Sequence, residues 1–145
     1  MNLTVLVDNN TYIDQYYRGE PAFSCYIEDG EKRILFDTGY SDLLLDNAAA
    51  MGIDVGRVTH IVLSHGHDDH SRGLRFLAER MDLRQTELIA HPDALLPKRD
   101  EDGPMGAPYT AEEAAKLTCY RPSKTPVWIT DHLLFLGEIP RTNDF

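Results

Sequence analysis

The chain has 145 residues, of which 42% are apolar, and this suits one globular domain or half of a larger one and excludes a disordered chain. The net charge is −10, from 14 basic and 24 acidic side chains, so we expect no nucleic-acid partner. No apolar run approaches the ~18 residues of a membrane span, and the first residues do not resemble a signal peptide. We therefore expect a cytoplasmic protein without a membrane partner.

The first third of the sequence alternates short apolar runs with turn residues. Residues 3–7, 23–27 and 32–36 are rich in β-branched, aromatic and other apolar side chains, which predicts three strands. Asp29-Gly30 lies between the second run and the third, and this pair favours a tight hairpin turn. We expect the third strand to return alongside the second.

A helix and then a buried strand are predicted next. Ser41 or Asp42 can cap a helix that runs to about Met51, and Gly52 is typical of a residue that follows a helix end. Residues 58–63 form an almost wholly apolar run with several β-branched side chains. This composition favours a strand that is covered on both faces.

The second half of the chain continues the alternation of strands and helices. A helix is predicted over residues 72–81, a strand over 87–90, and a helix over 111–117 with Thr110 as its cap. The segment 97–108 is rich in Pro, Gly and charge, which predicts a long loop of the kind that often covers a functional site. Further strands are predicted over residues 117–120, 127–129 and 133–136. Strands mixed with helices in this way predict an α/β layered fold.

Two cysteines occur, Cys25 and Cys119, and they are too few for a disulfide framework. Both fall within predicted strands. We therefore expect both to be small, buried apolar residues with no metal or redox role.

Metal-binding side chains are concentrated directly after residues 58–63. His65, His67, Asp69 and His70 lie within six positions. Histidines two positions apart can point at one cation, and the following carboxylate and histidine can hold a second. Imidazole nitrogen with carboxylate oxygen suits Zn²⁺, as one ion or two, with Mn²⁺ or Fe²⁺ as alternatives. A purely structural zinc site fits less well, because such sites are usually rich in Cys.

This motif resembles the metal-binding motif of the metallo-β-lactamase superfamily. Residues 36–39, which read Phe-Asp-Thr-Gly, and the strand over residues 59–63 support the resemblance. It implies an αββα sandwich, in which two β-layers lie between helices and the fold is built from two similar halves. The chain is most similar to the branch of dihydropterin-ribofuranosyl-aminobenzene-phosphate synthase-like metal-dependent hydrolases. The residues that suggest this branch are 3–9, 91–94 and 137–141.

The resemblance also implies roles for individual residues. His65 and His67 resemble ligands of a first metal, and Asp69 and His70 resemble ligands of a second, with Asp69 also the candidate catalytic carboxylate. Asp37 resembles a carboxylate at the sheet edge that orients the ligand loop and so supports catalysis. The alternative for Asp37 is a simple turn residue.

The second half of the superfamily's fold normally supplies more ligands: a His to the first metal, a bridging carboxylate in most members, and a His to the second metal. No matching motif follows His70 in this sequence. We therefore expect residues 1–145 to form a single domain that is the N-terminal half of the sandwich. Such a half would expose an apolar sheet face, which predicts a homo-oligomer or a separate C-terminal half as partner.

Several polar residues outside the motif have two readings. His91 could line the pocket, although a cap for the turn that follows it is the simpler role. We expect His60 to be structural and His132 to be exposed. Lys98 and Arg99 could meet an anionic substrate, or they could form a solvent-exposed charge pair.

The leading functional hypothesis is a hydrolase that uses a metal-activated hydroxide on a small-molecule ester, amide or cyclic phosphoester substrate. The second is a non-catalytic half-domain that binds metal weakly and needs a partner chain, because this chain offers only two ligands per metal. A diiron oxidoreductase would share the motif. It usually carries an extra carboxylate ligand and a flavin domain, and this sequence contains no flavin domain.

Overall fold

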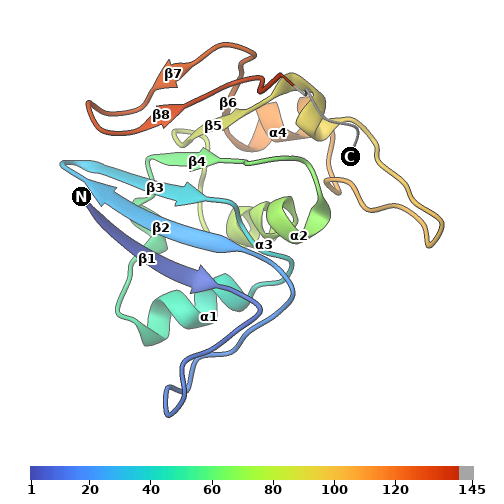
Figure 1. The fold of residues 1–145 in the computed structure, drawn as a ribbon. Coiled ribbons are helices and arrows are strands. Elements are labelled where there is room, and N and C mark those ends of the chain that lie inside the picture. Colours follow the sequence, from blue (N-terminus) through green and yellow to red (C-terminus); the bar gives the residue numbers. More distant parts are fainter. Residues whose placement is uncertain (141–145) are drawn as a thin grey trace.

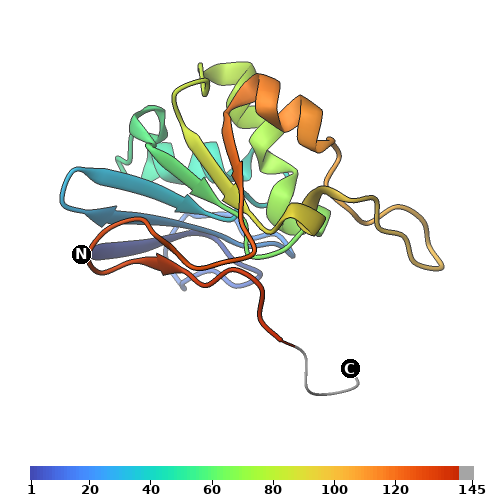
Figure 2. The same cartoon turned by 90° about the horizontal axis from the view of Figure 1, so that it is seen from above.

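A computed structural model describes residues 1–140 of the chain. A six-stranded sheet lies at the centre, and a two-stranded sheet is formed by β7 (Val127–Trp128) and β8 (Leu134–Phe135). Figure 1 labels these elements, and Figure 2 shows the helices on one face of the large sheet and the β7–β8 hairpin on the other. This layering confirms the predicted α/β layered fold.

The large sheet has the strand order β1-β2-β3-β4-β5-β6. The first three strands pair in antiparallel fashion, which confirms the predicted hairpin, and β3 to β6 pair in parallel fashion. The parallel strands are joined by helical crossovers on the covered face. The strands are β1 (Asn2–Val7), β2 (Ser24–Asp29), β3 (Lys32–Phe36), β4 (His60–Val62), β5 (Glu87–Ala90) and β6 (Cys119–Pro122).

Thr110 caps its helix as predicted, in a capping box with Glu113. The helix that begins at Leu43 has Asp42 as its N-cap residue, but the Asp42 side chain makes no capping hydrogen bond, and the hydroxyl of Ser41 accepts a hydrogen bond from the backbone N–H of Leu43. None of the helices within residues 1–140 is long and apolar enough to cross a membrane. The helices are α1 (Leu43–Ala50), α2 (Asp68–Ser71), α3 (Gly73–Arg80) and α4 (Ala111–Leu117), with 3-10 turns η1 (Val55–Arg57) and η2 (Pro92–Leu95).

The helix predicted over residues 72–81 is confirmed as α3, but a short helix before it, α2, was not predicted: it starts at Asp68 inside the metal-binding motif, and the helical backbone of Arg72 links it to α3. One predicted strand boundary is wrong. The strand expected over residues 117–120 begins at Cys119, because α4 continues through Leu117. The unpredicted helix α2 matters for the site, since it moves two of the proposed ligands from a loop onto a helix.

One expectation for the cysteines is also wrong. Cys25 is buried in β2 as predicted, but Cys119 is exposed. It lies in β6, the outermost strand of the large sheet in the described residues, where most side chains are exposed. An edge strand has no neighbour on its outer side, so a position in a strand does not ensure burial.

Alternation of side chains along the strands divides the core between the two faces of the sheet. In β3, Leu35 packs with the helices, whereas Ile34 packs against the β7–β8 hairpin. In β4, Ile61 packs on the helix side and Val62 on the hairpin side, which confirms that the strand after α1 is covered on both faces. The same alternation places Leu88 on the helix side and Ile89 on the hairpin side.

Part of the hairpin-side face remains uncovered. Leu3 and Val5 of β1 pair in register with Ile27 and Cys25 of β2, which places all four side chains on the face opposite the helices. Leu3 is 60% exposed and Val5 is 41% exposed. The β7–β8 hairpin therefore covers the middle of this face, and an apolar strip along β1 faces solvent.

A polar contact ties the β7–β8 hairpin to the large sheet. The nearly buried carboxylate of Asp29, at the end of β2, accepts hydrogen bonds from Oγ1 of Thr130 (2.6 Å) and Nδ1 of His132 (3.0 Å). These hydrogen bonds hold the pKa of the Asp29 carboxyl below its ordinary value of 3.8, although burial acts in the opposite direction. His132 is exposed, as predicted, and its role is to fasten the hairpin.

We predict that Asp29→Asn lowers the melting temperature at neutral pH. Because the pKa of Asp29 is depressed in the folded state, its contribution to stability is present above pH 3.8 and is lost as the pH falls through the folded-state pKa. The difference in melting temperature between wild type and variant should therefore shrink below pH 3.8. Circular dichroism melts across pH 2.5–7 measure it, with Asp131→Asn as the control at an exposed neighbour. A difference that does not change with pH contradicts the assignment.

Candidate metal centre

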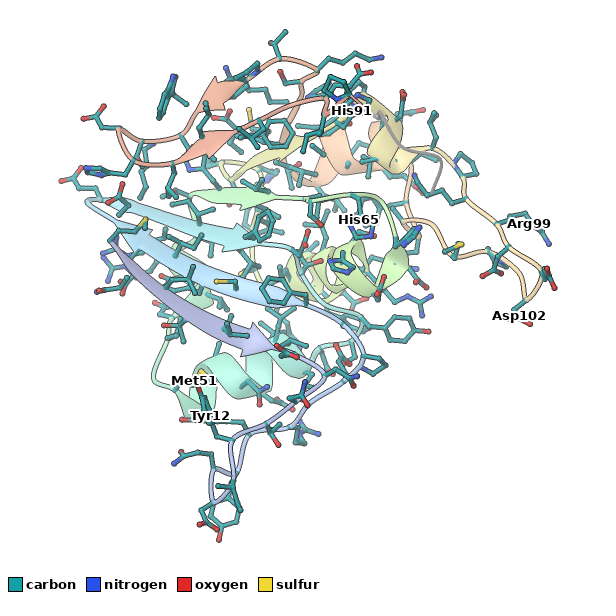
Figure 3. All side chains as sticks on the ribbon, viewed as in Figure 1. Tyr12, Met51, His65, His91, Arg99 and Asp102 are labelled. Carbon is teal, nitrogen blue, oxygen red and sulfur yellow. The ribbon has the colours of Figure 1, made fainter. Side chains whose placement is uncertain are left out.

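The candidate site lies where three parallel strands end. β3, β4 and β5 are adjacent and parallel, so their carboxyl ends meet at one edge of the sheet. Asp37 follows β3, the motif that begins at Ser64 follows β4, and His91 follows β5. Figure 3 shows the His65 side chain at this edge, beside α2.

The fold brings the predicted ligands together. Ligand atoms of His65, Asp69 and His70 lie within 4.8 Å of one another. Nε2 of His70 is 3.5 Å from the carboxylate of Asp69. His67 lies outside this group of three, but its ring packs edge-on against the ring of His65, with 4.6 Å between the ring centroids. All four proposed ligands are therefore neighbours, three of them in a compact group.

The buried carboxylate of Asp37 is hydrogen-bonded to residues of this group and of the loop before it. Asp37 is 1% exposed, and its Oδ1 accepts a hydrogen bond from the backbone N–H of Ser64 (2.8 Å). Its Oδ2 lies 2.7 Å from the hydroxyl of Ser64 and 2.7 Å from Nδ1 of His70. Asp37 has φ +55°, a conformation that Asp tolerates better than most residues. The structure thus favours the orienting role of Asp37 over that of a simple turn residue.

These hydrogen bonds set the tautomers of two histidines. An ionised Asp37 can only accept, so Nδ1 of His70 donates to it, and in the neutral form of His70 this leaves the lone pair on Nε2 available. Nδ1 of His65 lies 2.8 Å from the Ser64 hydroxyl, whose proton points to Asp37. His65 therefore donates to Ser64, and its Nε2 is also free. Both imidazoles present the nitrogen that a metal requires.

The electrostatics of the site also favour neutral imidazole. Burial lowers the pKa of His65, and the neighbouring His70 and His67 lower it further, while the carboxylates of Asp37 and Asp69 raise it in part. A neutral imidazole can bind a cation without first releasing a proton. The donor set of imidazole nitrogen and carboxylate oxygen thus fits Zn²⁺, Mn²⁺ or Fe²⁺.

The helix α2 positions the second pair of proposed ligands. His67 has an extended backbone at the N-terminal cap of α2, and its carbonyl accepts a hydrogen bond from the Ser71 hydroxyl (2.7 Å). Asp69 and His70 follow on the first turn. The carbonyl of His70 accepts hydrogen bonds from the backbone N–H (2.7 Å) and the hydroxyl (3.1 Å) of Thr38. The residues after β3 therefore anchor α2 to the sheet edge.

Asp68 lies outside the cluster. Its carboxylate forms an ion pair with Arg72 (2.6 Å), whose guanidinium stacks over the ring of Tyr40 at 4.0 Å from the ring centroid. Its backbone N–H donates to the carbonyl of Met105. Asp68 thus fixes α2 to its surroundings and is not one of the grouped ligand residues.

The other polar residues take mainly structural roles. Nδ1 of His91 accepts a hydrogen bond from the backbone N–H of Asp93 and caps η2, as expected. His60, which was expected to be structural, is buried beside Thr59. Lys98 is not part of a solvent-exposed charge pair, since its ammonium donates to backbone carbonyls, and its contact with an anionic substrate stays a prediction.

Sequence reasoning missed Ser64 and Thr38, which connect Asp37 and His70 to the sheet edge. Ser64 lies after β4 and directly precedes His65, and Thr38 lies after β3 and directly follows Asp37. Their proximity in sequence to the motif residues is the signal that could have identified them.

The sequence model of the metallo-β-lactamase superfamily matches residues 17–142. The chain belongs to this superfamily. The uncharacterized protein MJ0448 of Methanocaldococcus jannaschii is 32% identical over 144 residues, which are 99% of this chain and 55% of that protein. From the same organism, 7,8-dihydropterin-6-methyl-4-(beta-D-ribofuranosyl)-aminobenzene-5'-phosphate synthase is 36% identical over 64 residues, which are 43% of this chain and 21% of the synthase.

The fold matches solved structures of the superfamily. Tm1679, a metal-dependent hydrolase of the β-lactamase superfamily, aligns with a TM-score of 0.74 and 27% identity, over 93% of this chain and 47% of Tm1679. The chain spans about half the length of MJ0448 and of Tm1679. The chain therefore has the fold of part of a superfamily domain.

We predict that Asp37→Asn weakens Zn²⁺ binding by about 10- to 100-fold, the usual cost of losing a partner that orients a metal ligand. Asn tolerates the positive φ, but its single amide oxygen cannot serve all the donors that Asp37 satisfies. Competition with a chromophoric chelator measures the dissociation constant. Asp82→Asn, an exposed carboxylate in the loop before β5, is the matched control. Equal affinities in wild type and Asp37→Asn contradict the role of Asp37.

Proposed function

We propose that this chain is a metal-dependent hydrolase and that His65, His67, Asp69 and His70 bind its metal. The observation that carries the proposal is the arrangement around Asp37, which leaves the Nε2 atoms of His65 and His70 free beside the carboxylate of Asp69. Membership of the superfamily supports the same chemistry.

We assign the ligands in two pairs. His65 and His67 hold a first ion, and Asp69 and His70 hold a second, with Zn²⁺ preferred and Mn²⁺ or Fe²⁺ possible. When bound, the metal supplies a water of lowered pKa and polarises the bond to be hydrolysed. Asp69 acts as ligand and as the catalytic carboxylate at the exposed side of the cluster. Asp37 acts through His70 and Ser64 and keeps the ligands oriented.

The proposed substrate is a small ester, amide or phosphoester. The 64-residue match to the dihydropterin-ribofuranosyl-aminobenzene phosphate synthase supports a phosphorylated or pterin-related compound, which would be anionic. The similarity covers 43% of this chain, so it supports a substrate class and no single compound.

We expect His65→Ala to reduce hydrolysis to the rate of the metal-free protein, because it removes a member of the compact ligand group. The assay supplies Zn²⁺ or Mn²⁺ and follows p-nitrophenyl acetate and bis(p-nitrophenyl) phosphate. His132→Ala is the control, since His132 fastens the β7–β8 hairpin far from the motif in sequence. If elemental analysis finds no metal bound to the wild-type protein, the proposed function is wrong.

We propose as a second candidate that the chain is a half-domain whose site is completed by another chain, either a second copy or a separate C-terminal half. Two observations favour it. The chain spans 55% of MJ0448 and 47% of Tm1679, and an apolar strip at Leu3 and Val5 faces solvent along β1. A partner that covers this strip would bury apolar surface and could add ligands to the metals.

Sedimentation velocity of the wild type and of a variant with a substitution in the apolar strip tests this second candidate. If a second copy covers the β1 face, the wild type should sediment as a dimer and Val5→Glu as a monomer, because a buried carboxylate without a partner opposes association. Lys116→Glu, on the exposed side of α4, is the control. Hydrolysis by a monomeric wild type, lost in His65→Ala, would exclude the half-domain candidate.

A further inference from the structure

The segment Pro97–Pro108, which we call the strap, is a small hairpin. Arg99 forms an antiparallel bridge with Pro104, and the backbone N–H of Met105 donates to the carbonyl of Lys98 (3.0 Å). The carboxylate of Asp100 accepts backbone N–H bonds that close the turn. Figure 3 shows Arg99 and Asp102 at the far end of the strap, away from the body of the protein. The segment expected to be a long loop is thus ordered by its own backbone bonds.

The returning limb of the strap pairs with the loop that carries the proposed ligands. Gly106 forms an antiparallel bridge with His67. The backbone N–H of Ala107 donates to the carbonyl of Gly66 (2.9 Å), and the N–H of Asp68 donates to the carbonyl of Met105 (3.0 Å). The ligand loop is therefore held along one side by a strand-like neighbour.

The η2 turn also packs closely against the same loop. A Cβ atom added to Gly66 would lie 1.7 Å from the carbonyl oxygen of Ala94 and 2.7 Å from Nζ of Lys98. Glycine at position 66 is thus required for this close approach. The loop between His65 and His67 is therefore in contact with both η2 and the strap.

Lys98 connects the η2 turn to the strap. It lies at the start of the strap, and its Nζ donates to the carbonyls of Ala94 (2.8 Å), Asp93 (3.1 Å) and Leu96 (3.1 Å). An ammonium has three N–H donors, and these carbonyls can accept all of them. The side chain therefore fixes η2, while the backbone carbonyl of Lys98 fixes the limb that pairs with the ligand loop.

We propose that Lys98 is a positioning residue for the metal site. Its ammonium holds the carbonyl of Ala94 against Gly66 and so fixes the direction in which His65 and His67 present their rings. This proposal rests on the proposed function, because it assumes that these histidines bind a metal. It assigns no contact between Lys98 and substrate.

A positioning role and a purely electrostatic role predict opposite effects. A positive charge beside the ligand loop repels a cation, so a neutral replacement of Lys98 would strengthen metal binding if charge alone mattered. If Lys98 positions the loop, its removal releases η2 and weakens binding, as loss of supporting hydrogen bonds does at other metal sites. The sign of the change in affinity separates the two roles.

The experiment measures the Zn²⁺ dissociation constant of the 145-residue chain by competition with a chromophoric chelator. Lys98→Met keeps most of the side chain's length and removes the ammonium, and we expect it to bind Zn²⁺ about 10- to 100-fold more weakly than wild type. Lys98→Arg retains donors near the carbonyls and should restore part of the affinity. Lys116→Met, an exposed lysine paired with Glu112 on α4, is the matched control and should bind like wild type.

A second variant keeps every charge. A Cβ at Gly106 would lie 2.9 Å from the backbone nitrogen of Lys98, so Gly106→Ala displaces the strap and should also weaken Zn²⁺ binding. If the circular dichroism melt of the metal-free protein shows that Lys98→Met does not fold, the Zn²⁺ affinity of Gly106→Ala tests the positioning role instead. If a folded Lys98→Met binds Zn²⁺ as tightly as wild type or more tightly, or if Gly106→Ala binds Zn²⁺ like wild type, the positioning role of Lys98 is wrong. The proposed function would not be affected by either result. No binding by the wild type overturns the proposed function as well.

Discussion

The hydrogen bonds to the buried carboxylate of Asp37 hold the metal-binding edge together. Asp37 follows β3, whereas its donors come from Ser64 after β4 and from His70 in α2, 33 positions away. A buried carboxylate is strongly unfavourable without partners, so its hydrogen bonds to these segments hold them together at the sheet edge. The same bonds that satisfy the charge orient two imidazoles. The same hydrogen bonds of Asp37 thus stabilise this edge of the sheet and orient the imidazoles that are proposed to bind a cation.

Local patterns in the sequence predicted most of the fold. The runs at residues 3–7 and 32–36 form strands, Thr110 caps its helix, and the apolar run after α1 is covered on both faces. These features depend on propensity, periodicity and capping, which act over a few residues. The motif residues were found in the same way, because their spacing is itself the signal.

Features that depend on distant partners were not predictable. Nothing near Asp29 in the sequence indicates that His132 will bind it, and nothing near Gly66 indicates that Ala94 and Lys98 will lie against it. The exposure of Cys119 follows from the position of β6 at the edge of the described sheet, which strand propensity does not encode. Each of these contacts is set by strand order, and strand order is a property of the whole chain.

The two hydrogen bonds that join the strap to the ligand loop run between backbone atoms, at Gly66 with Ala107 and at Asp68 with Met105. These bonds do not involve the side chains at the tip of the strap. Substitutions of Arg99 or Asp102, which lie at its far end, can therefore change the surface of the tip without breaking them. Such a hairpin can vary in sequence at its tip while the backbone contacts to the loop that carries His65 and His67 stay the same.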